Sequence, residues 1–129
     1  MRMQKRKWQK SAPELVNLFQ ETMEVFPDAQ KRKMFGYPCC FINGNMFTGL
    51  HEQNWVVRLS EEDRLKLMSA YKARVFEPMP GRPMKEYIAL PKTILDDTKL
   101  RTQWISRSLE YAASLPPKVK KLRKKRSNT

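Results

Sequence analysis

The chain has 129 residues and a formal net charge of +13, from 26 Lys and Arg against 13 Asp and Glu. This length predicts one domain with one core, and no apolar run reaches the ~18 residues that a membrane span needs. No apolar segment of signal-peptide type follows the basic first residues, so we expect a cytoplasmic protein without a membrane partner.

The chain begins with a basic arm, residues 1–10, which carries +5. Its candidate nucleic-acid contacts are Lys5, Arg6 and Lys7. Ser11 and Glu14 then have the capping-box spacing that starts a helix. Apolar residues with helical spacing continue to Phe26, and Pro27 ends this predicted helix.

Three strands are expected within residues 31–59. Asn43-Gly44 lies between two apolar segments and is the strongest local hairpin signal, because a type I′ turn needs positive φ at both central residues. A turn around residues 52–54 leads to the third strand, residues 55–59. Gly36 and Pro38 indicate a bulge or kink early in the first strand.

Ser60 is the predicted N-cap of a second helix, which has three acidic residues in its first turn. The side chains expected to face the core are those of Leu65, Met68 and Tyr71. Two short strands follow, at residues 75–76 and 87–90.

The loop between these two strands, FEPMPGRPMKEY at residues 76–87, is longer and richer in proline than a plain hairpin turn. Its cations can bind a carboxylate or phosphate, and its methionines offer adaptable apolar contact. Candidate ligand or partner contacts are Glu77, Met79, Arg82, Met84 and Lys85. Alternatively, the loop is a structural flap that packs its methionines on its own core. Glu77 and Glu86 could form an acid/base pair, but pairing with Arg82 and Lys85 is the simpler account.

Pro91 begins a short helical turn, and Asp97 or Thr98 starts the last helix. Its expected apolar face consists of Leu100, Trp104, Ile105, Leu109 and Ala112. Pro116-Pro117 stop this helix, and residues 116–129 form a second basic arm, which carries +7 and is expected to be disordered when free. Its candidate nucleic-acid contacts are Lys118, Lys120, Lys121, Arg123, Lys124, Lys125 and Arg126.

The folded domain is therefore expected at residues 11–115, with a net charge of only +1. Basic arms of this kind bind polyanions by releasing counterions from phosphates, and they can also serve as solubilising tails. The element order is helix, three strands, helix, two strands, helix. It predicts an α+β fold with two layers, in which helices cover one face of an antiparallel sheet.

In the first hairpin, the strand period of two divides the apolar residues between two faces. One face is expected to carry Cys39, Phe41, Met46, Thr48 and Leu50, and the other Cys40, Ile42 and Phe47. Both sets are apolar enough to bury. The face without helices would be an exposed apolar patch, which predicts a homodimer or another protein partner.

No catalytic or metal site is evident in the sequence. His51 is the only histidine, and no spacing pairs it with a nucleophile and a carboxylate. Cys39 and Cys40 are adjacent, so on a strand they point to opposite faces and suit neither a disulfide nor a zinc site. We expect reduced thiols, no cofactor and no metal.

Five segments, in this order, resemble the N-terminal domain of the TfoX/Sxy family. They are RKMFGYP at 32–38, FINGNMFTGLH at 41–51, RLSEEDR at 58–64, FEPMPGRPMKEY at 76–87 and SLEYAASLPPK at 108–118. The resemblance covers about residues 11–118 and implies a two-layer α+β fold. For two-domain members it implies regulation of natural competence genes together with a transcription activator, but the 129 residues leave no room for their second, helical domain.

The resemblance implies no catalytic residues. We therefore expect a stand-alone, non-enzymatic regulatory or adaptor domain whose basic arms can contact nucleic acid. The alternative is a small enzyme or ligand-binding protein that uses a pocket beside the loop at residues 76–87.

Overall fold

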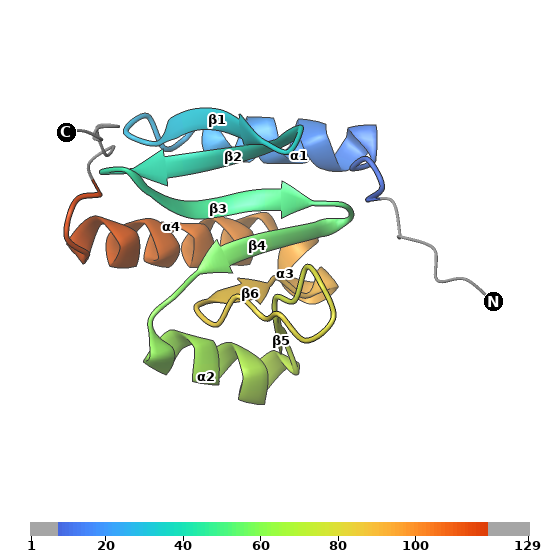
Figure 1. The fold of residues 1–129 in the computed structure, drawn as a ribbon, viewed down its shortest axis with the longest axis vertical. Helices are drawn as coiled ribbons and strands as arrows, with labels where there is room; N and C mark the ends of the chain where they lie inside the picture. Colours follow the sequence, from blue (N-terminus) through green and yellow to red (C-terminus); the bar gives the residue numbers. More distant parts are fainter. Residues whose placement is uncertain (1–7, 119–129) are drawn as a thin grey trace, which may run out of the picture.

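A computed structural model describes residues 8–118 as one α+β unit (Figure 1). The elements, in chain order, are α1 (Pro13–Met23), β1 (Gln30–Met34), β2 (Tyr37–Ile42), β3 (Asn45–His51), β4 (Asn54–Arg58), α2 (Glu61–Tyr71), β5 (Arg74–Val75), β6 (Tyr87–Ala89), α3 (Lys92–Leu95) and α4 (Thr98–Ser114). The predicted fold class is confirmed, with one strand more than expected between the first two helices.

The six strands form one antiparallel sheet in the order β1-β2-β3-β4-β6-β5. Figure 1 shows α1, α3 and α4 behind one face of this sheet, and α2 beyond β5 at its edge. We call the helix-covered side the closed face. The other side, which no helix covers within residues 8–118, we call the open face.

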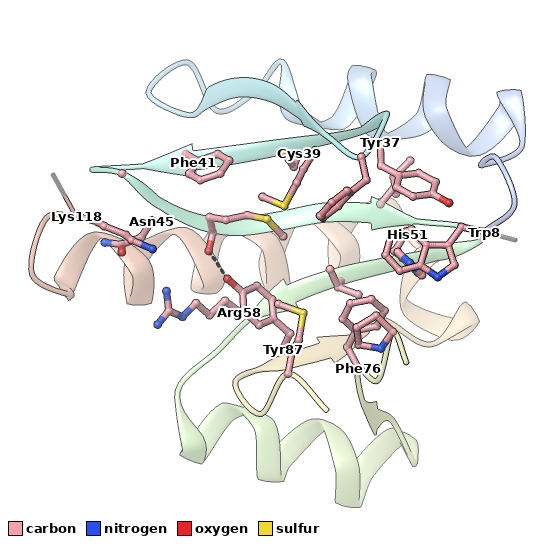
Figure 2. A pocket seen from close by; sticks show the side chains of 18 residues that line it. Trp8, Tyr37, Cys39, Phe41, Asn45, His51, Arg58, Phe76, Tyr87 and Lys118 are labelled. Atoms are coloured by element: carbon pink, nitrogen blue, oxygen red, sulfur yellow. Dashed lines mark hydrogen bonds between the residues drawn. The ribbon is translucent and has the colours of Figure 1, made fainter. Parts of the chain in front are cut away.

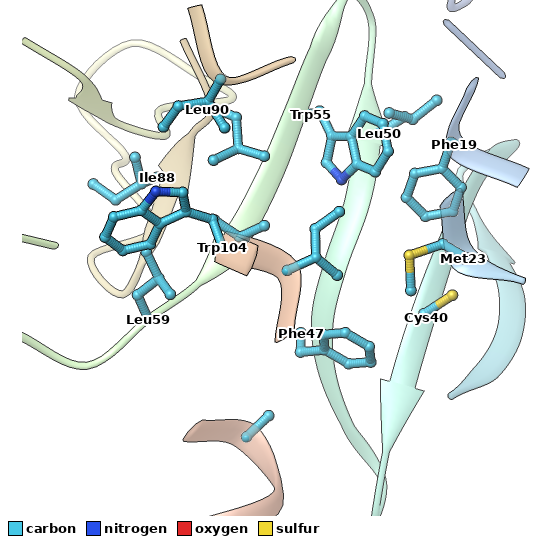
Figure 3. Close-up of a cluster of buried hydrophobic side chains, with 14 of the residues drawn as sticks. Phe19, Met23, Cys40, Phe47, Leu50, Trp55, Leu59, Ile88, Leu90 and Trp104 are labelled. Carbon is cyan, nitrogen blue, oxygen red and sulfur yellow. The ribbon is translucent and has the colours of Figure 1, made fainter. Parts of the chain in front are cut away.

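The core fills the space between the closed face and the helices (Figure 3). Phe47 and Trp55 are fully buried there, together with Ile105 of α4. The Trp55 indole Nε1 donates a hydrogen bond of 2.8 Å to Thr48 Oγ1, so its polar atom is satisfied inside the core. Each large side chain buried in this way stabilises the fold by about 1.5–3 kcal/mol.

The start of the first helix differs from the prediction. Ser11 and Glu14 form no capping box: α1 begins at Pro13 after Ala12, and the helix has no side-chain cap. Proline suits this first position because the backbone N–H there has no partner within a helix, so its absence costs nothing. Ser11 Oγ instead donates to the carbonyl oxygen of Glu52 and ties the helix start to the β3–β4 turn.

The second helix begins as predicted but buries a different leucine. Ser60 Oγ accepts a hydrogen bond from Asp63 N at 3.3 Å, which confirms the cap. Leu65, however, is 56% exposed, and Leu67 is fully buried in its place. The helix lies at the edge of the sheet, so it buries only a narrow stripe, and the exposed Leu65 is not part of that stripe.

The strand missed by the prediction is β1, whose five residues are all exposed. It pairs with β2 through a turn at Phe35-Gly36, where φ is +55° and +85°, so Gly36 marks a turn rather than a bulge. The predicted turn at Asn43-Gly44 is confirmed, with φ of +53° and +81°.

The irregularity in the first predicted hairpin lies further along the chain. Cys40 pairs with Thr48 and Phe41 with Met46, so Phe47 is an extra residue opposite this step. The bulge reverses the alternation beyond it. Thr48 and Leu50 therefore lie on the closed face, opposite Val57 and Trp55, and their predicted place beside Phe41 is wrong.

Candidate binding site on the open face of the sheet

The open face is hollowed by a cavity of about 290 Å³, which we call the open-face pocket (Figure 2). Its aromatic lining consists of Trp8, Phe35, Tyr37, Phe41, Phe76 and Tyr87. The alternation along β2 turns residues 37, 39 and 41 toward this side, and Met46 lies on the same side because it pairs directly with Phe41. The predicted apolar patch on the helix-free face is thus present, in a concave form.

One end of the pocket is a cluster of rings around His51, the last residue of β3. Its imidazole centroid lies 4.4 Å from that of Trp8 and 5.2 Å from those of Tyr37 and Phe76. Figure 2 shows these rings converging at the end of the pocket opposite Lys118. The buried imidazole supports the wall of the pocket.

Trp8 reaches this end because residues 8–10 are fastened to the sheet. Gln9 N donates to Glu52 Oε2 at 2.8 Å, and the Tyr37 hydroxyl donates to Gln9 O. Gln53 Nε2 also donates to the Lys10 carbonyl at 2.9 Å. The last part of the predicted arm at residues 1–10 is therefore a wall of the pocket. An isolated tryptophan in a polar, basic segment was the signal that could have indicated this contact.

Arg58 and Tyr87 form the polar side of the pocket. Arg58 Nε donates to Glu86 Oε1 at 2.7 Å, and the Tyr111 hydroxyl donates to Glu86 Oε2 at 3.3 Å. The expected pairing of Glu86 with Arg82 or Lys85 is therefore replaced by a link between β4, the loop and α4. The Tyr87 hydroxyl donates to Met46 O at 2.9 Å, and burial raises its pKa, so it remains a donor at neutral pH.

Residues 116–118 close the far end of the pocket. Lys118 N donates to Asn43 O at 2.8 Å, and Asn45 Nδ2 donates to Pro116 O at 3.2 Å. A Cβ atom on Gly44 would lie 1.9 Å from Lys118 O, so only glycine allows this close approach. The first residues of the predicted second arm are therefore docked on the β2–β3 turn.

The loop at residues 76–87 contributes apolar contacts to the pocket rather than charged ones. Pro78 and Met84 line the cavity, whereas the other candidate residues of the loop, Glu77, Met79, Arg82 and Lys85, do not. The loop is closed on itself, since Glu77 Oε2 accepts a hydrogen bond from Gly81 N. Met79 is 47% exposed, so the alternative of a flap with both methionines on the core is wrong.

The charged side chains that line the pocket itself are both positive. Arg58 and Lys118 line it, and none of the 13 acidic residues of the chain does, although all of them lie within residues 8–118. The other predicted nucleic-acid contacts lie outside the described residues: Lys5, Arg6, Lys7, Lys120, Lys121, Arg123, Lys124, Lys125 and Arg126.

Two further findings concern chemistry and membranes. Across residues 8–118, no three His, Cys, Asp or Glu side chains gather in a way that could hold a metal ion. None of the helices described is both long and apolar enough to span a bilayer.

Comparison with known proteins shows which family this domain resembles. A search of curated proteins found no match. Residues 21–112 match the family model of the TfoX N-terminal domain, which includes β1–β6 and most of α4. Trp8 and Lys118, at the two ends of the pocket, lie outside the matched span. Because the match covers well over half of the 129 residues, the chain belongs to the TfoX N-terminal domain family.

Proposed function

We propose that this chain is a non-enzymatic regulatory or adaptor domain that contacts nucleic acid through its two basic arms. The observation that carries the proposal is the position of the two residues from which the arms continue. Trp8 and Lys118 line opposite ends of the open-face pocket, so both arms begin at the rim of one surface. A regulatory role also agrees with membership of the TfoX N-terminal domain family.

The charge of the chain supports a polyanionic partner. Residues 1–7 carry four cations and residues 119–129 carry six, with no acidic residue in either segment, so residues 8–118 retain only +3. If about five phosphates are neutralised, the logarithm of the affinity should fall with the logarithm of salt with a slope of about −4. Raising the salt from about 50 to 200 mM would then weaken binding by a factor of about 100–500.

The chemistry of the pocket favours a binding role over catalysis. Cys39 is the nucleophilic side chain that lines the pocket, and burial raises its pKa, which lowers the fraction of reactive thiolate. Glu86, which could act as an acid or base, is held by Arg58 and Tyr111. Both carboxylate oxygens of Glu86 accept hydrogen bonds, which leaves this group less available for proton transfer.

A small-molecule binding protein is the second candidate, and the form of the pocket favours it. The cavity of about 290 Å³ lies beside the loop at residues 76–87, which contributes Phe76, Pro78 and Met84. This volume is close to the lower end of the ~300–1,000 Å³ typical of ligand pockets. The ligand would be small and mostly apolar, and its binding would not depend on the arms.

The arms are tested by ending the chain at Lys118, which keeps the segment docked on the β2–β3 turn. Binding to a fluorescent oligonucleotide should weaken, and its salt dependence should become shallower. The matched control is the double variant Lys92→Gln, Lys99→Gln, which removes two cations from α3 and α4 and should change neither quantity. Unchanged affinity and salt slope after the truncation would contradict the proposal.

A further inference from the structure

We propose that the open face binds single-stranded nucleic acid by stacking bases on its aromatic side chains. The arms then contact the phosphates, and the open face holds the bases. This inference rests on the proposed function, because it assigns the bases of the same ligand whose phosphates the arms contact. It adds a preference for single strands over duplex, which the arms alone do not give.

The first observation is an exposed phenylalanine in an unfavourable backbone conformation. Phe35 has a φ of +55° and is 76% exposed. A bulky residue at positive φ is strained, and an exposed ring gains little from folding. Its ring packs edge-on against Trp8, with 5.5 Å between centroids, so the two rings form one corner of the open-face pocket. Strain of this kind is concentrated at functional sites.

The second observation is the pairing of rings with guanidinium groups on the same face. Arg32 Cζ lies 4.8 Å from the centroid of Phe41, and Arg58 Cζ lies 5.8 Å from that of Tyr87. Aromatic rings and arginine planes are the two surfaces on which proteins stack unpaired bases. Glu86 offsets the charge of Arg58, so this arginine contributes its plane more than its charge.

The size of the site limits the occupant. A cavity of about 290 Å³ has room for one or two planar groups and not for a folded domain. In a duplex the base faces are already stacked on one another, so the aromatic wall offers it no additional contact. A single strand exposes its base faces, which can enter the pocket between Trp8 and Lys118 while its phosphates stay in solvent.

Charge also distinguishes a nucleic acid from a second copy of the chain. A symmetric dimer through the open face would bury the apolar rim, as the sequence predicts. It would also bring Trp8 and Lys118 of both copies to one interface, and each copy continues from these residues into segments with ten cations in all. Repulsion between like charges opposes this arrangement, most strongly at low salt. Of the two cations in the lining, Arg58 is paired with Glu86, and Lys118 contributes a positive charge that suits a polyanion.

The test compares binding of a 12-nucleotide oligothymidine and a 12-base-pair duplex to the full-length chain by fluorescence anisotropy. The main variant is Phe35→Asn, because asparagine tolerates positive φ and the ring is removed without loss of the turn. The second is Phe41→Ala, with Phe41→Tyr as the conservative variant that keeps a ring. The control is Leu65→Ala, which removes an exposed apolar side chain from α2.

We expect the full-length chain to prefer the single strand by at least about tenfold. Phe35→Asn and Phe41→Ala should each weaken single-strand binding by about 5- to 100-fold, as for removal of one stacked base, with the salt slope and duplex binding unchanged. Phe41→Tyr and Leu65→Ala should bind as the parent does. Thermal melts identify any variant that fails to fold. If Phe41→Ala does not fold, the binding of Phe35→Asn decides between the outcomes.

Three outcomes would overturn the inference. Equal affinity for single strand and duplex, still dependent on the arms, would refute base stacking and leave the proposed function standing. Absence of binding to either nucleic acid at low salt would refute both proposals. A dimer in sedimentation that Phe41→Ala converts to a folded species near 15.3 kDa would assign the open face to self-association.

Discussion

The two faces of the sheet are built from the same strands but differ in how deeply their apolar side chains are buried. On the closed face, Phe47, Trp55 and Ile88 are fully buried under the helices. On the open face, Phe41 and Tyr87 are half-buried, and Phe35 is mostly exposed. Folding explains the closed face, because its apolar surface leaves water. Burial also accounts for Tyr37, Val56 and Phe76 on the open face, but not for the exposed ring of Phe35, and this difference supports the proposal that the open face is a binding surface.

The largest contrast should appear between two phenylalanines of one hairpin. Phe47→Ala removes a fully buried ring from the closed face and should lower the free energy of unfolding by about 3–5 kcal/mol. Phe41→Ala removes a half-buried ring from the open face and should cost about 1–1.5 kcal/mol, since about half as much apolar surface is lost. Urea denaturation measures both. Equal losses would show that the open face is as important for folding as the closed face.

The rim of the open face can be tested at its two tight turns. Gly36 and Gly44 both have φ above +80°, so alanine at either position should cost about 1–2 kcal/mol in backbone strain. A Cβ at Gly44 also collides with Lys118 O, whereas one at Gly36 meets nothing within 4 Å. Gly44→Ala should therefore cost more than Gly36→Ala. In a chain that ends at residue 115 the two losses should become equal, and a persistent difference would contradict docking of residues 116–118.

The adjacent cysteines, one on each face, allow the two faces to be compared by their stability at alkaline pH. Burial raises the pKa of the Cys40 thiol on the closed face to about 11, from an ordinary value near 9, and Cys39 adds to this shift. Below about pH 9 the folded and unfolded chains both hold the proton. Between about pH 9 and 11 only the folded chain keeps it, so the free energy of unfolding falls as pH rises.

Cys40→Ala should reduce this alkaline loss more than Cys39→Ala, because burial raises the pKa of Cys39 less than that of Cys40; a nearby cation, Arg32 for Cys39 and Lys31 for Cys40, opposes each rise. Denaturant melts at pH 8 and pH 10 measure the difference for each variant. A larger effect of Cys39→Ala would place the less polar environment on the open face and contradict the contrast between the faces.

The smallest expected effect is an increase in stability. Phe35→Asn replaces a strained, exposed residue by one that tolerates positive φ, so the free energy of unfolding should rise by about 0.5–1 kcal/mol. Thermal melts at neutral pH detect a change of this size. A loss of more than about 1 kcal/mol would mean that the Phe35 ring supports the fold through its contact with Trp8.

The elements predicted correctly are those with local signals. The Asn43-Gly44 turn, the Ser60 cap and the apolar stripe of α4 each depend on residues that are close in sequence. The strand β1 was missed because its exposed, charged residues show no alternation. The Phe35-Gly36 turn was missed because phenylalanine is rare at positive φ.

The candidate site was predictable only in part. The strand period of two was enough to place Phe41 and Met46 on a helix-free apolar face. The bulge at Phe47, which moves Thr48 and Leu50 to the other face, depends on packing against the helices. The contacts of Gln9 with Glu52 and of Lys118 with Asn43 join residues more than 40 positions apart, so no local pattern indicated where the arms begin.

The central claim is that the open face binds nucleic acid while the closed face holds the fold together. It is tested most directly by titrating the ¹⁵N-labelled chain with a 12-nucleotide oligothymidine and following the backbone amide shifts by NMR. The account predicts shifts in β2, in β6 and at Phe35, with little change in α1 and α4, which cover the closed face. Shifts confined to the helices, or to residues outside 8–118, would contradict it.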